Sequence, residues 1–177
     1  LAVPGVATAD ALPAGAGRPA PTGARVGRVA AASGAHDGYV AAVVASLEGR
    51  RLDGLTAVVD CANGSAAVVA PGVLRSLGVD VHVLHDRPDG LNINDRCGST
   101  HTGGLARTVV ERGADLGVAF DGDADRVLLI DAAGELVDGD QIIAMCAIDR
   151  RARGALTGGA VVVTVMSNMG FRLAMDQ

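Results

Sequence analysis

Short apolar runs of strand length alternate with amphipathic stretches of helix length along most of this chain, and no other feature of the sequence constrains its fold as strongly. Each run is bounded by Gly, Asp or Asn, as buried strands usually are. A repeated strand–helix order favours parallel strands joined by helical crossovers, so the sequence predicts an α/β fold with a parallel, doubly wound sheet. The expected strands are residues 55–60, 79–84, 116–120, 127–130 and 161–165.

The stretches between these runs predict helices. Apolar residues recur at helical spacing between 37 and 47, with Asp37 placed to cap the first turn and Gly49 to end the helix. Further helices are expected over about 65–77, up to Arg112 before Gly113, over about 141–151, and from Gly170 onward.

The ends of the chain differ from its middle. Residues 1–34 are rich in Ala, Gly and Pro without a sustained hydrophobic period, which predicts a linker or extended segment. We expect one α/β domain over residues 35–157 and the truncated start of another over residues 158–177. Because the chain begins with Leu, it is expected to be an excised or incomplete segment.

Composition excludes several classes of protein. Hydrophobic residues make up 49% and charged residues 20%, which is typical of a globular chain. The net charge is −5, lysine is absent and the arginines are scattered, so we expect no nucleic-acid partner. No apolar run is long enough to cross a bilayer, so we also expect no membrane partner.

The cysteines give no metal or disulfide pattern. Cys61, Cys97 and Cys146 are odd in number and widely spaced, which favours a reducing cytoplasm. We expect Cys61 and Cys146 to be small core residues and Cys97 to be an exposed loop residue.

The residues that indicate chemistry follow the strand over 116–120. Asp121, Asp123 and Asp125 alternate with Gly122 and Ala124, so a tight curve of the backbone can aim the three carboxylates at one point. Open α/β sheets bind ligands at this end of their strands. Three close carboxylates repel one another unless a cation neutralises them, and oxygen ligands select magnesium or calcium.

Two other interpretations of this segment remain open, and a third, an EF-hand loop, fails. Asp and Gly also form simple solvated turns. An EF-hand loop would need Gly at its sixth position and Glu at its twelfth, where this chain has Arg126 and Ala132. In a haloacid-dehalogenase-like phosphatase, Asp121 would be a phosphoryl-accepting nucleophile. That pattern usually continues with Thr or Val rather than with a third Asp and an Arg.

Other polar residues have architectural interpretations. Asp60 and Asn63 flank an expected strand-to-helix turn, where Asn commonly shapes the backbone. Asp138 and Asp140 precede the helix expected from Gln141, which predicts a capping role. His101 is expected to form hydrogen bonds within a loop.

Residues 121–126 resemble the metal-binding loop of the α-D-phosphohexomutases, which reads Asp-Gly-Asp-Gly/Ala-Asp-Arg. The flanking stretches extend this resemblance to the second domain of that family and cover about residues 21–177; the first twenty residues resemble nothing that identifies them. The stretches are Val-Val-Asp-Cys-Ala-Asn-Gly at 58–64, Gly-Leu-Asn-Ile-Asn at 90–94, Gly-Ser-Thr-His at 98–101, Val-Asp-Gly-Asp-Gln at 137–141 and Thr-Val-Met-Ser-Asn-Met-Gly at 164–170.

The resemblance implies a three-layer α/β/α fold with a mainly parallel sheet. It also implies that Asp121, Asp123 and Asp125 hold Mg²⁺, which family members bridge to a phosphoserine while isomerising a hexose phosphate through a bisphosphate intermediate. Arg126 would contact a phosphate, or instead form an ion pair that steadies the loop. The ending over 164–170 favours a hexosamine phosphate substrate over mannose or glucose phosphates.

One part of the family's machinery is not in this sequence. The catalytic serine loop reads Thr-x-Ser-His-Asn-Pro, and Ser99-Thr100-His101 only resembles it superficially. Thr102-Gly103-Gly104 also departs from the family's His-Pro-Glu, which puts the start of the next helix in doubt. We therefore expect the chain to be inactive alone and to work with the remaining domains of the same enzyme, and homo-oligomer formation stays open.

Overall fold

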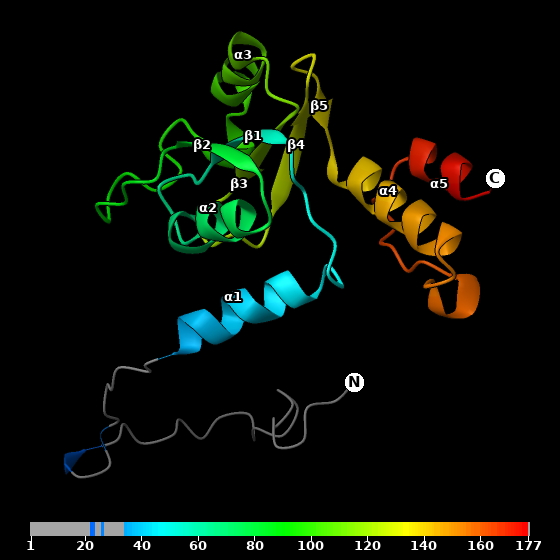
Figure 1. Ribbon diagram of the computed structural model, residues 1–177, viewed down its shortest axis with the longest axis horizontal. Helices are drawn as coiled ribbons and strands as arrows, with labels where there is room; N and C mark the ends of the chain where they lie inside the picture. The colour runs from blue at the N-terminus through cyan, green and yellow to red at the C-terminus, as the bar shows by residue number, and fades with distance from the viewer. Residues whose placement is uncertain (1–21, 24–25, 27–33, 177) are drawn as a thin grey trace, which may run out of the picture. The chain divides into compact units, whose positions relative to one another are not determined.

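The computed structural model describes residues 22–23, 26 and 34–176. The predicted linker over residues 1–34 lies almost entirely outside the described residues. The chain divides after Ala35, and residues 36–177 form one compact unit (Figure 1). Its elements are α1 (Ala35–Ala45), β1 (Thr56–Asp60), α2 (Ala66–Ser76), β2 (Asp80–Leu84), η3 (Gly98–Thr100), α3 (Gly103–Arg112), β3 (Leu116–Phe120), β4 (Val127–Asp131), β5 (Leu136–Val137), α4 (Gly139–Ala152), η4 (Thr157–Gly159) and α5 (Met169–Met175).

The strands form one mixed sheet in the order β2-β1-β3-β4-β5. β1 runs parallel to both β2 and β3, whereas β4 runs antiparallel to β3 and to β5. The α/β class is confirmed, but the sheet is not parallel throughout. Six residues separate Phe120 from Val127, which pair with each other, and a parallel crossover needs a dozen or more. The acidic segment is therefore the loop of a β-hairpin.

Helices cover both faces of the sheet. Successive residues of a strand point to opposite sides, so β1 contributes side chains to a core on each face. Ala57, Val59 and Cys61 pack with α2 residues on one face. Val58 packs with Leu105 and other α3 residues on the opposite face. Figure 1 shows α2 and α3 on opposite sides of the strands. Burying each fully enclosed Val or Leu side chain stabilises the fold by about 1.5–3 kcal/mol. The two clusters therefore hold β1 and β3 in place, and with them the loops that follow these strands.

The strand predicted over residues 161–165 is wrong. Within the described residues no strand follows β5, and Val162 and Val165 are 96% and 89% exposed. A β-branched run becomes a strand only where another strand completes its hydrogen bonds, and the described part of the chain provides none for this segment. The two-residue strand β5 is too short to produce a recognisable sequence pattern.

Helix ends differ from the predictions by a few residues. α1 begins at Ala35, so Asp37 lies inside its first turn instead of capping it. α3 begins at Gly103, with Thr102 at the N-cap position but without a side-chain cap, and it ends at Gly113 in the left-handed conformation. No helix in the described part of the chain is both long and apolar enough to span a bilayer.

Two of the three cysteine predictions are wrong. Cys61 is buried as expected, but Cys97 is also buried and Cys146 is exposed. Cys97 lies beneath a loop that folds back onto the sheet, where the next residue donates its backbone N–H to buried Asp60. Cys146 lies on α4, on a side that the described residues leave open to solvent.

Candidate metal centre

Three loops meet at the carboxyl ends of the parallel strands. The first follows β1 and spans residues 61–65, the second follows β2 and spans residues 85–97, and the third is the acidic loop, residues 121–126, after β3. Since the carboxyl ends of parallel strands lie at one edge of a sheet, the fold itself brings these loops together. The acidic loop therefore lies beside backbone from two other segments.

The acidic loop gathers its three aspartates. One carboxylate oxygen from each of Asp121, Asp123 and Asp125 lies within 4.8 Å of the others. Ala124 adopts a left-handed backbone conformation with φ of 59°, and its N–H donates to the Asp121 carbonyl over 3.1 Å. This tight turn curls the loop and points the carboxylates to one side. Asp121 is 1% exposed, whereas Asp123 and Asp125 face solvent.

The two oxygens of Asp121 have different environments. Oδ1 accepts the backbone N–H of Arg126 over 3.1 Å. Oδ2 is buried, and Nη2 of Arg126 lies 2.5 Å away in an ion pair. The guanidinium balances the charge of this oxygen, so a cation would reach Oδ2 only by displacing the Arg126 side chain.

Arg126 lowers the pKa of Asp121. Burial would raise the pKa of Asp121, but the backbone N–H and the guanidinium of Arg126 outweigh it and hold this pKa below its ordinary value. The pKa of Arg126 is raised in turn, first by its hydrogen bond to Asp125 and then by Asp121. Nε of Arg126 lies 3.3 Å from Oδ1 of Asp125, so one guanidinium spans two of the three acids.

A second cluster of possible ligands lies beside the first, and its chemistry is structural. Asp60, His85 and Cys97 each place one ligand atom within 4.8 Å of the others. Asp60 already accepts the backbone N–H groups of Ala62 and Gly98, each over 2.9 Å, and His85 Nδ1 lies 3.0 Å from its Oδ1. Burial, and next the charge of Asp60, raise the pKa of the Cys97 thiol, which keeps this sulfur protonated.

The remaining polar predictions are architectural; those for Asn63 and Asp138 agree with the structure, and the capping role predicted for Asp140 is wrong. Asn63 adopts a φ of 48°, and its amide accepts the N–H of Arg87. Asp138 is the N-cap of α4 and forms a reciprocal capping box with Gln141. Asp140 does not cap; its Oδ2 accepts the backbone N–H of Asn168 over 2.7 Å.

The loop hydrogen bond expected of His101 is present, because its Nδ1 lies 3.1 Å from Thr100 Oγ1. Sequence reasoning did not find the contacts between loops. Ser65 donates its N–H to the Gly122 carbonyl, and Asn94 donates its N–H to the Ala62 carbonyl, both over 2.9 Å. No local motif predicts these bonds, because each one joins residues more than thirty positions apart.

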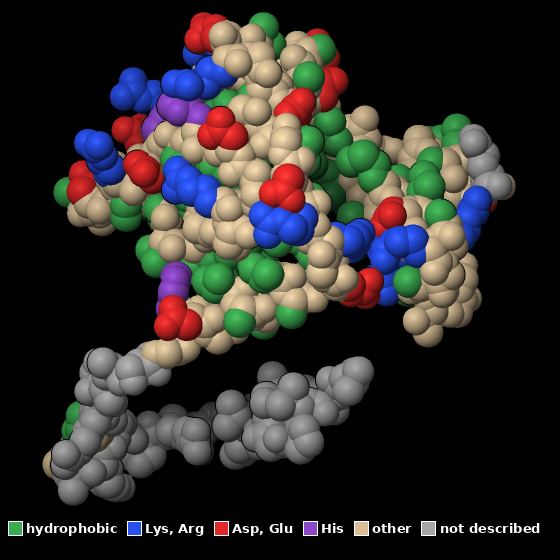
Figure 2. Space-filling model, viewed as in Figure 1, with side chains coloured by type: hydrophobic (Ala, Val, Ile, Leu, Met, Phe, Trp, Pro, Cys, Tyr) green, Lys and Arg blue, Asp and Glu red, His purple; other side chains and the backbone are tan. Residues whose placement is uncertain are grey.

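An apolar groove lies next to the acidic loop without containing it. Its cavity of about 480 Å³ is bordered by Val43 of α1, Val69 and Val73 of α2, and Val118 of β3, and its rim reaches Asp123. Figure 2 shows hydrophobic side chains gathered between α1 and the body of the domain. An apolar lining does not suit a charged ligand, so the polar site is the open surface of the three loops.

The family model described as "Phosphoglucomutase/phosphomannomutase, alpha/beta/alpha domain II" matches residues 37–134, from α1 to the turn after β4. The chain belongs to the phosphoglucomutase/phosphomannomutase family. The match contains all of the acidic loop and both neighbouring loops. It confirms the family resemblance and the domain type that the sequence motifs predict.

Curated relatives of high sequence identity within the family are phosphoglucosamine mutases. The protein from Pelotomaculum thermopropionicum is 56% identical over 162 residues, which are 92% of this chain and 36% of the relative. The protein from Rhodococcus opacus is 52% identical over 160 residues, or 90% of this chain and 36% of the relative. This chain therefore spans little more than a third of the length of these relatives.

Solved structures support the same fold. A phosphoglucomutase/phosphomannomutase family protein from Burkholderia thailandensis superposes with a TM-score of 0.58 and 25% identity, over 67% of this chain and 26% of that one. A putative phosphomannomutase from Thermus thermophilus superposes with the same TM-score and 22% identity, over 67% of this chain and 29% of that one. Both superpositions support the α/β fold of this chain.

Proposed function

We propose that this chain is the metal-binding segment of a phosphoglucosamine mutase, an isomerase that interconverts glucosamine-6-phosphate and glucosamine-1-phosphate. The observation that carries the proposal is the cluster of three carboxylates, in which Asp121 is buried and its Oδ2 is paired with the exposed side chain of Arg126. The chain that contains this cluster is 56% and 52% identical in sequence to two phosphoglucosamine mutases, over 92% and 90% of its length.

The residues fit a hard divalent cation. Carboxylate oxygens are the ligands that Mg²⁺ prefers, and a site with few protein ligands leaves coordination positions for water and phosphate. Asp121 would be the fixed ligand because it is buried and held by the main chain. Asp123 and Asp125 are exposed and would adjust to the ion. Bound Mg²⁺ would supply the positive charge that a phosphoryl group needs as it is transferred.

Arg126 would exchange one anionic partner for another. Its guanidinium now lies against Asp121 and Asp125, yet its side chain is 67% exposed and free to turn. Once a cation satisfies those carboxylates, the guanidinium would be available to bind two oxygens of a phosphate with its planar fork. The ion pair and the phosphate contact are then two states of the same side chain.

The other functions of the enzyme belong to the polypeptide that relatives have in addition to this segment. The phosphoryl-carrying serine and the groups that read the sugar would lie there, so we expect the chain alone to catalyse no isomerisation. We propose residues 35–157 as the family's second domain, residues 158–177 as the start of its third, and residues 1–34 as the linker before it. The free thiols suit a reducing cytoplasm.

A chimera tests the proposed function. This chain would replace the matching segment of the Pelotomaculum thermopropionicum enzyme, and isomerisation would be assayed with glucosamine, glucose and mannose 6-phosphates. We expect the chimera to isomerise glucosamine-6-phosphate and Asp121→Asn to abolish that activity. A folded chimera without isomerase activity would contradict the proposal.

A phosphatase assay of the chain alone tests the competing function. If the 177-residue chain alone hydrolysed p-nitrophenyl phosphate, and Asp121→Asn abolished that hydrolysis, Asp121 would be a nucleophile and the mutase proposal would fail. Asp131→Asn is the matched control in both assays. Asp131 accepts the N–H groups of Ala133 and Glu135 in the turn at the opposite end of β4, so its substitution removes the same charge far from the acidic loop.

A further inference from the structure

Asp60 is a buried carboxylate that the proposed metal centre does not use. It is the last residue of β1 and is 1% exposed. Its Oδ1 accepts the N–H of Ala62, and its Oδ2 accepts the N–H of Gly98. A buried charge is tolerated only when such donors compensate it. The same carboxylate also links Ala62 and Gly98, which are 36 positions apart in the sequence.

The first loop held by Asp60 is under local strain. Ala62 has a positive φ of 53°, which is unfavourable for alanine, and Asn63 follows with a φ of 48° in the left-handed region that Asn tolerates. The bond from the Ala62 N–H to Asp60 fixes this turn from one side. The bond from the Asn94 N–H to the Ala62 carbonyl fixes it from the other. Without the hydrogen bond to Asp60, the turn would relax toward a more favourable backbone conformation.

This strained turn is in direct backbone contact with the acidic loop. At its end, the Ser65 N–H donates to the Gly122 carbonyl over 2.9 Å. Gly64 lies so close to the Gly122 backbone that a β-carbon on Gly64 would overlap it. Gly122 directly follows Asp121, so a shift of residues 62–65 would move the residue next to the buried ligand.

The second segment held by Asp60, at Gly98, contacts the end of β3. A β-carbon on Gly98 would overlap the Phe120 carbonyl and the Ala62 side chain. Phe120 directly precedes Asp121. The two N–H groups bound by Asp60 thus anchor backbone segments that touch the residues on both sides of Asp121.

We propose that Asp60 is a positioning residue for the acidic loop: by holding the turns at Gly64 and Gly98 against residues 120–122, it sets where Asp121 presents its carboxylate and thereby the affinity for a divalent cation. This inference rests on the proposed metal function of the loop. Residues that orient metal ligands in this way commonly change metal affinity by about 10–100-fold when substituted.

Asp60→Asn in the 177-residue chain is the main test. An amide has one oxygen, so its NH₂ group must face at least one of the N–H donors that the carboxylate accepts, and one loop is released. We expect the dissociation constant for Mn²⁺, measured by electron paramagnetic resonance, to rise about tenfold or more. We also expect faster hydrogen exchange of the Ser65 amide.

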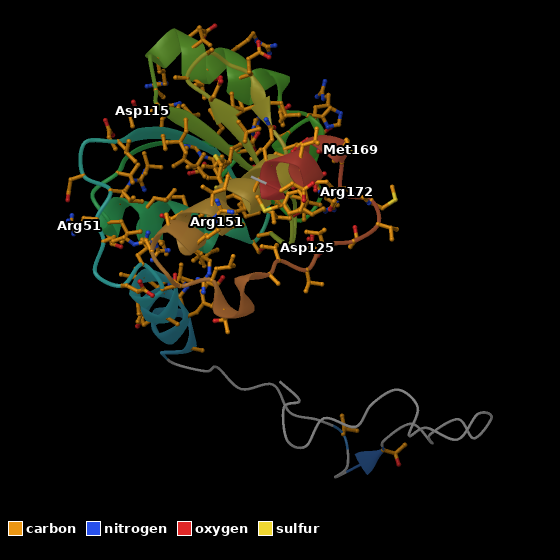
Figure 3. All side chains as sticks on the ribbon, turned by 90° about the vertical axis from the view of Figure 1, so that its right-hand side faces the viewer. Arg51, Asp115, Asp125, Arg151, Met169 and Arg172 are labelled. Atoms are coloured by element: carbon orange, nitrogen blue, oxygen red, sulfur yellow. The ribbon has the colours of Figure 1, made fainter. Side chains whose placement is uncertain are left out.

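Asp115→Asn is the matched control. Asp115 accepts the Thr56 N–H over 2.7 Å at the other end of β1, so its substitution also removes a charge and weakens a backbone bond. Figure 3 shows Asp115 and Asp125 on opposite sides of the domain. Mn²⁺ affinity and Ser65 exchange are expected to match those of the unsubstituted chain.

Gly98→Ala keeps every charge, Asp60 included, and crowds both Ala62 and the Phe120 carbonyl, so it displaces the turns that Asp60 holds. It is the second variant if Asp60→Asn does not fold. We expect it to weaken Mn²⁺ binding as well. Unchanged Mn²⁺ affinity in a folded Asp60→Asn or Gly98→Ala variant would overturn the inference. So would weaker binding with unchanged Ser65 exchange in Asp60→Asn, since that result would reflect lost charge alone. If the unsubstituted chain bound no Mn²⁺, the metal function would fail, whereas Ser65 exchange would still report whether Asp60 holds the loop.

Discussion

Arg126 contacts both oxygens of Asp121, one through its main chain and one through its side chain. The backbone N–H donates to Oδ1 over 3.1 Å, and Nη2 lies 2.5 Å from Oδ2. The main-chain bond is compatible with a cation on Oδ2, but the guanidinium occupies the space that the cation would enter. A divalent cation and the Arg126 side chain therefore compete for the same oxygen.

Arg126→Ala should consequently strengthen cation binding by the isolated chain while weakening catalysis by the chimera. Removing the competing charge should lower the dissociation constant for Mg²⁺ by about threefold, because the Arg126 guanidinium is largely exposed and solvent weakens its attraction to Asp121. Isothermal titration measures this change, and Arg107→Ala on α3 controls for loss of an exposed arginine. Weaker Mg²⁺ binding by Arg126→Ala would show that the guanidinium supports the cation instead of competing with it.

Gly64→Ala and Gly122→Ala should destabilise the fold unequally. A β-carbon on Gly64 would overlap the backbone of Gly122, whereas a β-carbon on Gly122 would meet chiefly the end of the half-exposed Ile93 side chain, which can turn away. We expect urea unfolding to give a loss of about 2 kcal/mol or more for Gly64→Ala, within the range for overpacked sites, and a smaller loss for Gly122→Ala.

Gly139→Ala is the control for this pair. No atom lies within 4 Å of a β-carbon at Gly139, in the first turn of α4, so the substitution should be neutral or slightly stabilising. Equal losses for Gly64→Ala and Gly122→Ala would contradict the close backbone approach at Gly64.

The three thiols should differ sharply in reactivity. Burial, followed by the charges of Asp60 and Asp86, raises the pKa of Cys61 to about 12, and burial also raises the pKa of Cys97. Cys146 is exposed. A disulfide reagent such as DTNB should therefore modify Cys146 rapidly in the native chain, and Cys61 and Cys97 only after denaturation. Fast native labelling that persists in Cys146→Ser would contradict this burial.

Asp89 should titrate at unusually low pH. The backbone N–H groups of Leu91 and Asn92 hydrogen-bond its carboxylate and hold its pKa below the ordinary value of 3.8. Because the folded-state pKa is lowered, the stabilisation is fully present above about pH 4 and is lost as the pH falls through the folded-state pKa. The Leu91 amide resonance should follow this change with a midpoint below 3.8. A midpoint at or above 3.8 would contradict the turn geometry.

Features that depend on neighbouring residues could be predicted from the sequence. The segment from Asp121 to Arg126 gives its own signal, because a strand ends directly on alternating acids. The cap at Asp138 and the helix end at Gly113 also follow local rules, and both agree with the structure. Local hydrophobic period likewise located the strands that form the two cores.

Features that depend on distant residues could not be predicted in this way. Cys97 looked exposed because nothing near it in sequence shows that Gly98 bonds to Asp60, 38 positions away. The run over residues 161–165 has strand propensity, but propensity does not supply a partner strand. The antiparallel direction of β4 follows from the shortness of the acidic loop, which became informative only once β3 and β4 were known to pair.

Cation binding by the isolated chain is the most direct test of the proposed metal centre. Mn²⁺ would be titrated into the 177-residue chain and followed by electron paramagnetic resonance, with Mg²⁺ as competitor. We predict one saturable site that Mg²⁺ displaces, that Asp121→Asn removes and that Asp131→Asn preserves. Absence of saturable binding at millimolar Mn²⁺, or equal binding by Asp121→Asn, would contradict the assignment of residues 121–126 as a metal-binding loop.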